Sequence, residues 1–186
     1  MLRWIKNLFA KEEPVKATID DETCIQRLVV NEGLKLKQYF CPAGHLTIGI
    51  GHNLDENPLT KEQKEYIGHP IKQGINEDQA FYICRCDLKN VRADLDRELP
   101  WWRDLDTERQ FVMIDLCFNM GIGKKGGKKG LLSFPKTLTS IATGSYETAS
   151  KQLLQSKYAK QTGDRALRNA YCLKYGKYLT KLPENW

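Results

Sequence analysis

The chain has 186 residues, of which 41% are hydrophobic and 28% charged, and its formal net charge is +6. This length suits one domain or two small lobes that share a cleft, and the composition excludes a disordered or fibrous chain. No apolar run reaches the roughly 18 to 20 residues that a bilayer span needs. The start of the chain lacks the apolar segment and cleavage site of a signal peptide, so we expect synthesis and retention in the cytoplasm.

The cysteines and histidines bear on metals and disulfides. Six cysteines, at positions 24, 41, 84, 86, 117 and 172, are scattered without a CxxC pair or the spacing of a zinc site. This pattern predicts free thiols. Three histidines form no cluster in the sequence, and we expect neither a metal nor a cofactor.

The first twenty residues form an N-terminal amphipathic extension. Apolar residues interleave with basic ones at Leu2, Arg3, Trp4, Ile5, Lys6, Leu8 and Phe9. One interpretation is a short helix docked on the protein body. The other is weak membrane contact through residues 1–10, because basic residues opposite Trp and Phe suit a membrane interface.

A core-facing helix is predicted after Ile19. Asp20 and Asp21 can cap it, and its apolar positions Ile25, Leu28 and Val29 have the i, i+3, i+4 spacing of a buried stripe. The next position on that stripe is Glu32. A carboxylate there is paired, exposed at the helix end, or held in a dry place for a purpose.

The pattern changes to a hairpin between Tyr39 and His52, with Pro42 and Gly44 in the turn. In an extended second strand, Thr47, Gly49 and Gly51 would share one face, and Ile48 and Ile50 the other. Glycines on one face indicate either a surface that a ligand approaches closely or a tight bend in the sheet.

Helices dominate the rest. Asn76 begins a long helix that can link two lobes, and Thr107 with Gln110 suggests a capping box for a very apolar helix. Shorter helices are predicted at about 134–142, 146–157 and 164–180. Residues 123–130, GKKGGKKG, are either a solvated loop or a basic lip that touches a polyanion.

Glu32, Cys41 and Thr47 form the candidate chemical group. They stand on a helix end, a turn and a strand that fold back locally, so all three can meet. Cleavage of a glycosidic bond needs a proton donor near the glycosidic oxygen and a second group that activates water or attacks the anomeric carbon. A nearby carboxylate would raise the pKa of the Cys41 thiol and keep it protonated near neutral pH.

At this point the sequence resembles the phage-type lysozymes, glycoside hydrolase family 24. The block NEGLKLKQYFCPAGHLTIGIGHNL, residues 31–54, looks like the family's E-G-x-(R/K)-L-x-x-Y segment followed by T-I-G-(Y/I)-G-H. Weaker similarity runs through residues 75–88, 117–121 and 160–170, so the resemblance covers about residues 21–180. It implies an α+β, mostly α fold in which a small hairpin-bearing lobe (21–75), a linking helix (76–97) and a larger helical lobe (98–186) flank a cleft. Together these form a lysozyme domain over residues 21–186.

The resemblance also implies roles for single residues. Glu32 matches the proton donor, Thr47 the active-site hydroxyl, and Cys41 a middle position where the family has Asp or Cys. Cys41 is then a weak base, a transient nucleophile or a neutral thiol that lines the cleft. The other implied roles are an arginine near the acid at Arg165, a structural pair of His52 with Asp87, and sugar contacts at Gly51, Phe118, Asn119 and Thr137. For Phe118, ordinary helix core is an equally good interpretation.

The implied function is a lysozyme, a muramidase that hydrolyses the β-1,4 bond between N-acetylmuramic acid and N-acetylglucosamine of bacterial peptidoglycan. One alternative is an inactive or weakly active wall-binding homologue. A second is a cysteine amidase or peptidase that pairs Cys41 with His45 or His52. Nucleic-acid binding is not expected, because no recognised motif accompanies the lysines.

The implied setting is phage-induced host lysis. As a phage endolysin, the protein would wait in the host cytoplasm until a holin opens the membrane, and would then act on the wall in the periplasm. We expect a monomer.

Overall fold

The computed structural model describes residues 17–184 and 186. The predicted membrane contact through residues 1–10, and most of the N-terminal extension, therefore lie outside the described residues. Within the described part, no helix is both long and apolar enough to cross a membrane.

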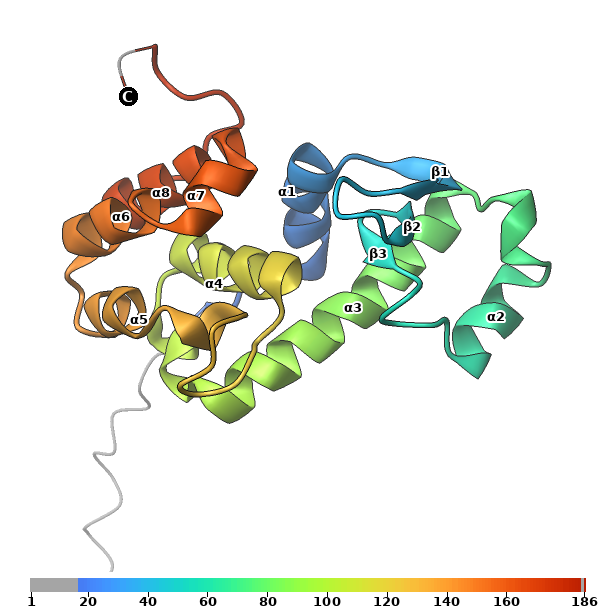
Figure 1. Ribbon diagram of the computed structural model, residues 1–186, viewed down its shortest axis with the longest axis horizontal. Coiled ribbons are helices and arrows are strands. Elements are labelled where there is room, and N and C mark those ends of the chain that lie inside the picture. Colours follow the sequence, from blue (N-terminus) through green and yellow to red (C-terminus); the bar gives the residue numbers. More distant parts are fainter. Residues whose placement is uncertain (1–16, 185) are drawn as a thin grey trace, which may run out of the picture.

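The architecture is α+β and mostly helical, as predicted (Figure 1). The helices are α1 (Asp21–Glu32), α2 (Lys61–Ile67), α3 (Glu77–Glu98), α4 (Thr107–Met120), α5 (Pro135–Ala142), α6 (Tyr146–Leu154), α7 (Lys157–Thr162) and α8 (Asp164–Tyr175). The strands β1 (Lys35–Phe40), β2 (Leu46–Gly49) and β3 (His52–Asn53) form one antiparallel sheet in the order β1-β2-β3. Short 3-10 turns lie at Ile71–Gln73, Pro100–Asp104 and Leu131–Ser133.

Two hydrophobic clusters make up the core, and α3 contributes to both. Near its start, Ala80 and Ile83 pack into a smaller cluster with residues of the sheet and α2. Further along, Leu88 and Leu95 pack into a larger cluster formed mainly by the other helices. Because a helix of 22 residues is about 33 Å long, α3 can contribute to one cluster near its start and to the other further along.

Helix α1 packs with the larger cluster, which changes the expected lobe boundary. Asp20 caps the helix by accepting a hydrogen bond from the Thr23 backbone amide at 2.8 Å. Ile25 and Leu28 are almost fully buried in the larger cluster. Residues 21–75 therefore do not form one lobe: α1 carries Glu32 from the helical side toward the sheet.

The hairpin is shorter than predicted. Strand β2 ends at Gly49, and both Gly49 and Gly51 have positive φ angles, of 67° and 71°. The chain therefore turns at residues 50–51 and returns as β3, so the expected alternation of faces stops at Gly49. Gly49 is also not on a bare face, because a Cβ atom there would lie 3.6 Å from the Ala80 Cβ.

Three helix limits differ from the predictions. The cap of α4 is Asp106, which accepts from the Arg109 backbone amide at 2.9 Å, so the expected Thr107 cap is wrong. Gln110 instead binds the incoming chain, accepting from the Ile19 amide at 3.1 Å. The helix expected at 146–157 ends at Leu154, a separate helix α7 that was not predicted begins at Lys157, and α8 ends at Tyr175 rather than near residue 180.

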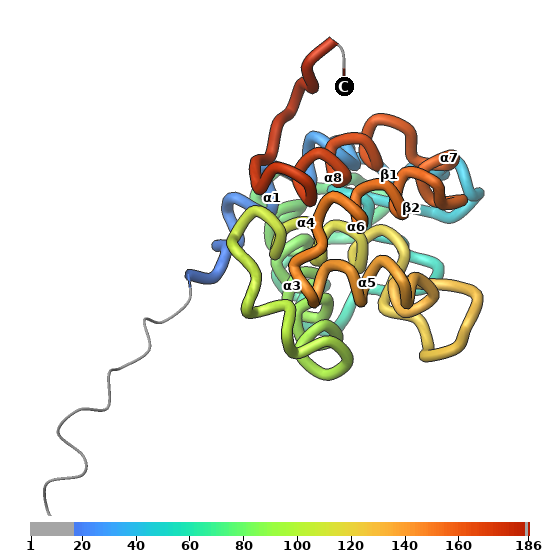
Figure 2. Tube along the Cα trace, turned by 90° about the vertical axis from the view of Figure 1, so that its left-hand side faces the viewer, coloured from blue at the N-terminus to red at the C-terminus, as the bar shows by residue number. Residues whose placement is uncertain are grey.

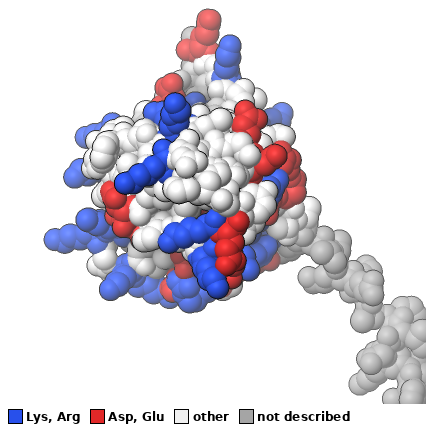
Figure 3. All heavy atoms as spheres, turned by 90° about the vertical axis from the view of Figure 1, so that its right-hand side faces the viewer, with Lys and Arg blue, Asp and Glu red and all other residues white. Residues whose placement is uncertain are grey.

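The lysine-rich segment at residues 123–130 is a closed loop. Its two arms meet at Gly123 and Gly130, where a Cβ on Gly130 would lie 2.5 Å from the Gly123 Cα. Two backbone hydrogen bonds of 2.9 Å, from Leu131 to Gly121 and from Leu132 to Ile122, close its base. Figure 2 shows the loop, in yellow, projecting from the body. On the face at the right-hand side of Figure 1, basic and acidic side chains both occur (Figure 3).

Candidate active site

Glu32 is the last residue of α1, and its side chain is held by an arginine from the far end of the chain. The Arg165 Nη1 donates to Glu32 Oε1 at 2.5 Å. The Glu32 side chain is 19% exposed, whereas that of Arg165 is 6% exposed. Solvent or a ligand can therefore reach the Glu32 carboxyl group, whereas the Arg165 guanidinium is buried.

Gly51 leaves space for this carboxyl group. A Cβ on Gly51 would lie 3.0 Å from both the carboxyl carbon and Oε2 of Glu32. A side chain at position 51 would therefore displace Glu32. This close approach, rather than a sugar contact, is the structural role that we find for Gly51.

Arg165 is itself fixed by Asp115, a residue of α4 that is fully buried. The Nε and Nη2 atoms of Arg165 donate to the two carboxylate oxygens of Asp115 at 2.9 and 2.8 Å. Burial lowers the pKa of Arg165, but Asp115 and Glu32 outweigh it and raise the pKa above the usual range. The guanidinium is therefore a permanent charge beside Glu32, as the resemblance implied for this position.

Cys41 and Thr47 are neighbours at the tip of the hairpin. The Cys41 amide donates to the His45 carbonyl at 2.9 Å, and the Gly44 amide donates back to the Cys41 carbonyl at 2.8 Å. Thr47 is buried, and its hydroxyl donates to the His45 carbonyl at 2.9 Å. The same carbonyl accepts the Cys41 amide, so both residues are held by His45.

The pKa of the Cys41 thiol is lowered, not raised as the sequence led us to expect. The slight burial raises the pKa, but hydrogen bonds from the backbone of His45, Ala43 and Gly44 and from the Thr47 hydroxyl outweigh it. Hydrogen bonds to a thiolate favour the charged form. Cys41 is therefore better suited to act as a base than its sequence position suggested.

Tyr39 brings the two halves of the site into one neighbourhood. It lies opposite Thr47 in the β1–β2 pairing. Burial raises the pKa of Tyr39, and the charges of Glu32 and Cys41 raise it further. Tyr39 therefore senses the charge of both groups, while the meeting of Glu32, Cys41 and Thr47 at one substrate stays a prediction.

His52 and Asp87 form the pair that the resemblance implied. The His52 Nδ1 and the Asp87 Oδ2 are 2.8 Å apart, and the imidazole is 4% exposed. This pair ties β3 to α3. The His52 Nε2 is buried, and no hydrogen bond joins it to a partner among the described residues.

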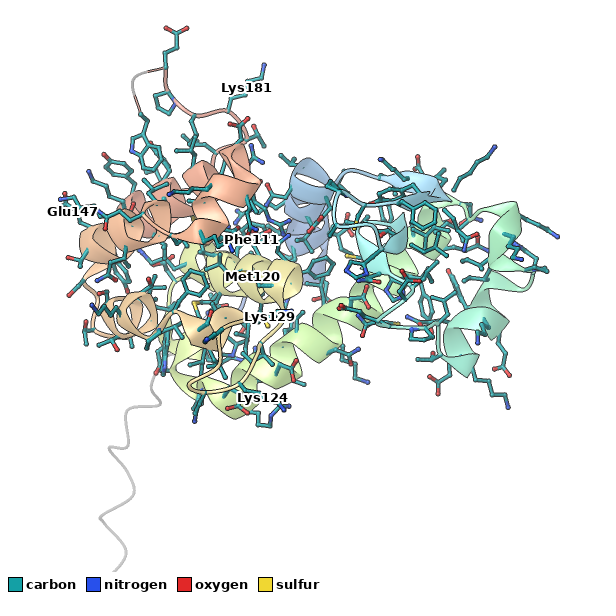
Figure 4. All side chains as sticks on the ribbon, viewed as in Figure 1. Phe111, Met120, Lys124, Lys129, Glu147 and Lys181 are labelled. Atoms are coloured by element: carbon teal, nitrogen blue, oxygen red, sulfur yellow. The ribbon has the colours of Figure 1, made fainter. Side chains whose placement is uncertain are left out.

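The proposed sugar contacts on α4 and α5 are not all in one place. Phe118 and Asn119 follow Asp115 by three and four residues, so they share its face of α4. They lie just before Met120, the last residue of that helix, which Figure 4 labels. Phe118 packs partly against the larger cluster, while Asn119 is exposed. Thr137 lies in a separate hollow of about 410 Å³ that does not include Glu32. That hollow is lined by Ser133, Phe134, Pro135, Lys136, Thr137, Gln152 and Gln155.

The other cysteines differ from Cys41. All six are free thiols, and burial raises the pKa of Cys24, Cys117 and Cys172 to about 12. Among the described residues, no group of three or more His, Cys, Asp and Glu side chains is placed to hold a metal ion.

Asp115 is the site residue that our sequence reasoning missed. The signal was present, because Asp115 is a lone carboxylate within the apolar run FVMIDLCF of the predicted helix. A charge on such a helix requires a buried partner. What the sequence did not show was which cation supplies it, since Arg165 lies 50 residues further along the chain.

A family model described as phage lysozyme matches residues 30–170. The chain belongs to the phage lysozyme family. The match contains Glu32, Cys41, Thr47, Asp115 and Arg165, so the whole constellation lies in the region that defines the family. The lysozyme-like fold predicted from the resemblance is thereby confirmed.

Three curated relatives are similar at lower identity. The pre-baseplate central spike protein Gp5 of Enterobacteria phage T4 is 29% identical over 150 residues, which are 74% of this chain and 25% of the spike protein. Probable T4-type lysozyme 1 of Dictyostelium discoideum is 26% identical over 76% of this chain and 87% of its own length. The endolysin of Acyrthosiphon pisum secondary endosymbiont phage 1 is 28% identical over 72% and 77%. Family and relatives support a muramidase-like function.

The lowered pKa of Cys41 predicts which thiol of this lysozyme homologue reacts first. With iodoacetamide in the folded state, Cys41 should be alkylated fastest, because the thiolate is the nucleophile and its fraction rises at a lower pH than in a free cysteine. Mass spectrometry of tryptic peptides over a pH series measures this. Cys41→Ser should remove the fast phase; a fast phase that survives in this variant would contradict the assignment.

Substitution of Gly51 tests the contact with Glu32. Gly51→Ala forces both a positive φ and a close contact with the carboxyl group, so wall hydrolysis should fall at least about tenfold. Gly144→Ala is the matched control, because Gly144 has a φ of 74° and open space around a Cβ. Both variants should lose about 1 to 2 kcal/mol of stability through backbone strain. Equal activity of the two variants would show that Gly51 does not serve Glu32.

Proposed function

We propose that the protein is a peptidoglycan muramidase that hydrolyses the β-1,4 bond between N-acetylmuramic acid and N-acetylglucosamine. The observation that carries the proposal is the placement of Glu32. Its carboxyl group stands at a helix end, partly exposed, with Arg165 on one side and Gly51 on another. A carboxyl group in this position can deliver a proton to a bound glycosidic oxygen.

The second half of the reaction is assigned to Cys41 and Thr47. Glu32 gives its proton to the leaving oxygen as the glycosidic bond breaks. A water molecule attacks the anomeric carbon, and the Cys41 thiolate accepts the proton that this water loses. Thr47 supports the thiolate by turning its hydroxyl hydrogen from the His45 carbonyl to the Cys41 sulfur. Glu32 then regains a proton from solvent and the Cys41 thiol releases one to solvent, so the site returns to its starting state.

Substrate contacts are assigned to two regions of the larger lobe. Phe118 and Asn119 offer an aromatic ring and an amide near the end of α4, three and four residues after Asp115. The hollow that contains Thr137 offers hydroxyl, amide and aromatic groups, which suit an N-acetyl sugar or a peptide. Both regions belong to the proposal as binding surfaces for the glycan and its attached peptides.

The alternative of a cysteine amidase finds less support in the contacts of Cys41. Its hydrogen bonds come from backbone groups and from Thr47, and none of those recorded among the described residues comes from an imidazole. The His52 imidazole is only 4% exposed, and its recorded side-chain contact is with Asp87 rather than with Cys41. The wall-binding alternative predicts adsorption without hydrolysis, and the same assay separates it.

The cellular role we propose is host lysis, with the protein held in the host cytoplasm until a holin opens the membrane and then acting as a monomer on the periplasmic wall. The endolysin among the relatives supports this part of the proposal. Cells that express the protein should lyse when a holin is co-expressed. Lysis to the same extent without a holin would argue against this route.

Reducing ends released from purified bacterial walls test the enzymatic proposal. Wild type should release them, and Glu32→Gln should lose at least about a hundredfold in rate, because general acid catalysis contributes roughly 10²–10⁴-fold. Cys41→Asp should keep more activity than Cys41→Ser if the group is a base. Release of amino groups without reducing ends indicates an amidase, and binding without release indicates a wall-binding homologue; either result overturns the proposal.

A further inference from the structure

Arg165 serves two carboxylates that differ in their freedom to move. One edge of its guanidinium binds Asp115 in a fork of two hydrogen bonds, and the remaining nitrogen binds Glu32. Asp115 is 0% exposed, whereas the Glu32 side chain is 19% exposed. The two ends of this chain of charges therefore have different surroundings.

Asp115 is fixed by donors from two further residues. Asn31 Nδ2 donates to its Oδ1 at 2.8 Å, and Asn169 Nδ2 donates to its Oδ2 at 2.6 Å. Together with the two bonds from Arg165, each carboxylate oxygen accepts two hydrogen bonds. Asp115 thus cannot turn away without leaving buried polar groups unpaired, which is costly.

The charge balance of the site follows from this arrangement. Arg165 carries one positive charge, and Asp115 and Glu32 can each carry one negative charge. When Glu32 holds the proton that an acid must donate, Arg165 and Asp115 remain as a neutral, fully bonded pair. Without Asp115, a protonated Glu32 would leave a guanidinium that is only 5% exposed without a counter-charge.

We propose that Asp115 is a positioning residue that holds Arg165 and neutralises its charge, which allows Glu32 to keep the proton it donates. The inference rests on the proposed function, because it concerns the acid of that reaction. Asp115 acts only through Arg165 and does not contact the substrate.

Other titratable groups also face Glu32. Tyr39 approaches from β1 and Cys84 from α3, and burial raises the pKa of both, so each is neutral near neutral pH. The charge of Cys41 also acts on Tyr39, and the pKa of Cys41 is lowered, so its own titration must be removed from the measurement. A Cys41→Ser background does this.

The test is a carbon-13 NMR titration of the Glu32 carboxyl group in that background, with Asp115→Asn, Arg165→Gln and the double variant. Asp115→Asn should lower the titration midpoint by about one pH unit, because Arg165 then attracts only the charge of Glu32. Arg165→Gln should move the midpoint in the opposite direction, because Asp115 is left as an uncompensated neighbour. The double variant should lie between the two. Asp78→Asn, on the exposed first turn of α3, is the control and should leave the midpoint unchanged.

If the two single variants shift the titration midpoint of Glu32 in opposite directions, the effect comes from charge balance. Loss of packing alone would not make the two shifts opposite in sign. Thermal unfolding checks that each variant folds. If Asp115→Asn does not fold, the titration midpoint of Glu32 in Arg165→Gln still tests the inference. An unchanged midpoint in folded Asp115→Asn, or shifts in the same direction, would overturn the inference.

A kinetic readout distinguishes failure of this inference from failure of the proposed function. With Cys41 intact, Asp115→Asn should move the alkaline limb of kcat/KM on walls to lower pH by a similar amount. Expected NMR shifts with no wall hydrolysis by wild type would overturn the muramidase proposal. Hydrolysis by wild type with an unmoved alkaline limb in Asp115→Asn would overturn the role of Asp115.

Discussion

Arg165 carries a positive charge into an interior where it is only 5% exposed, and such a charge is stable only among paired acceptors. Its guanidinium supplies three of the bonds that hold the end of α1 and the middle of α4 against α8. Arg168 adds a bond from α8 to Asn31, which also binds Asp115. The position of Glu32 is therefore a consequence of how the helical lobe packs.

The small lobe meets this assembly from the other side. Its sheet turns back after Gly49, so Gly51 approaches the carboxyl group of Glu32 where a larger residue would clash. Cys41 and Thr47 lie in the same hairpin, where Tyr39 pairs with Thr47 and its pKa is raised by the charges of Cys41 and Glu32. The position of Glu32 thus depends on the buried charge of Arg165 on one side and on the backbone turn at Gly51 on the other. The long helix α3 contributes to both clusters and so connects the two lobes.

Much of this could be predicted because its signals are local. The stripe that ends at Glu32 and the Asn76 start of α3 were both found from the sequence, and Asn76 does accept from the Gln79 amide. Helix α2 was missed although Thr60 and Gln63 form the same kind of capping box. The similar pattern at Thr107 was misleading, because the preceding residue, an aspartate, is the better cap.

Distant relations were harder to predict. The pairing of Asp115 with Arg165, across 50 residues, depends on how the helices pack, and periodicity does not reveal it. The strand alternation predicted through Gly51 failed because glycine permits the positive φ angles at which the chain turns. The pKa of Cys41 was expected to rise because the backbone of the turn, which stabilises the thiolate, could not be anticipated.

We propose that this member of the phage lysozyme family cuts the glycan strand on the reducing side of N-acetylmuramic acid. Borohydride reduction and mass spectrometry after digestion of purified walls identify the new chain end. A muramidase leaves reduced muramic acid at the new ends. Reduced glucosamine at those ends, or new amino groups in their place, would contradict the proposal.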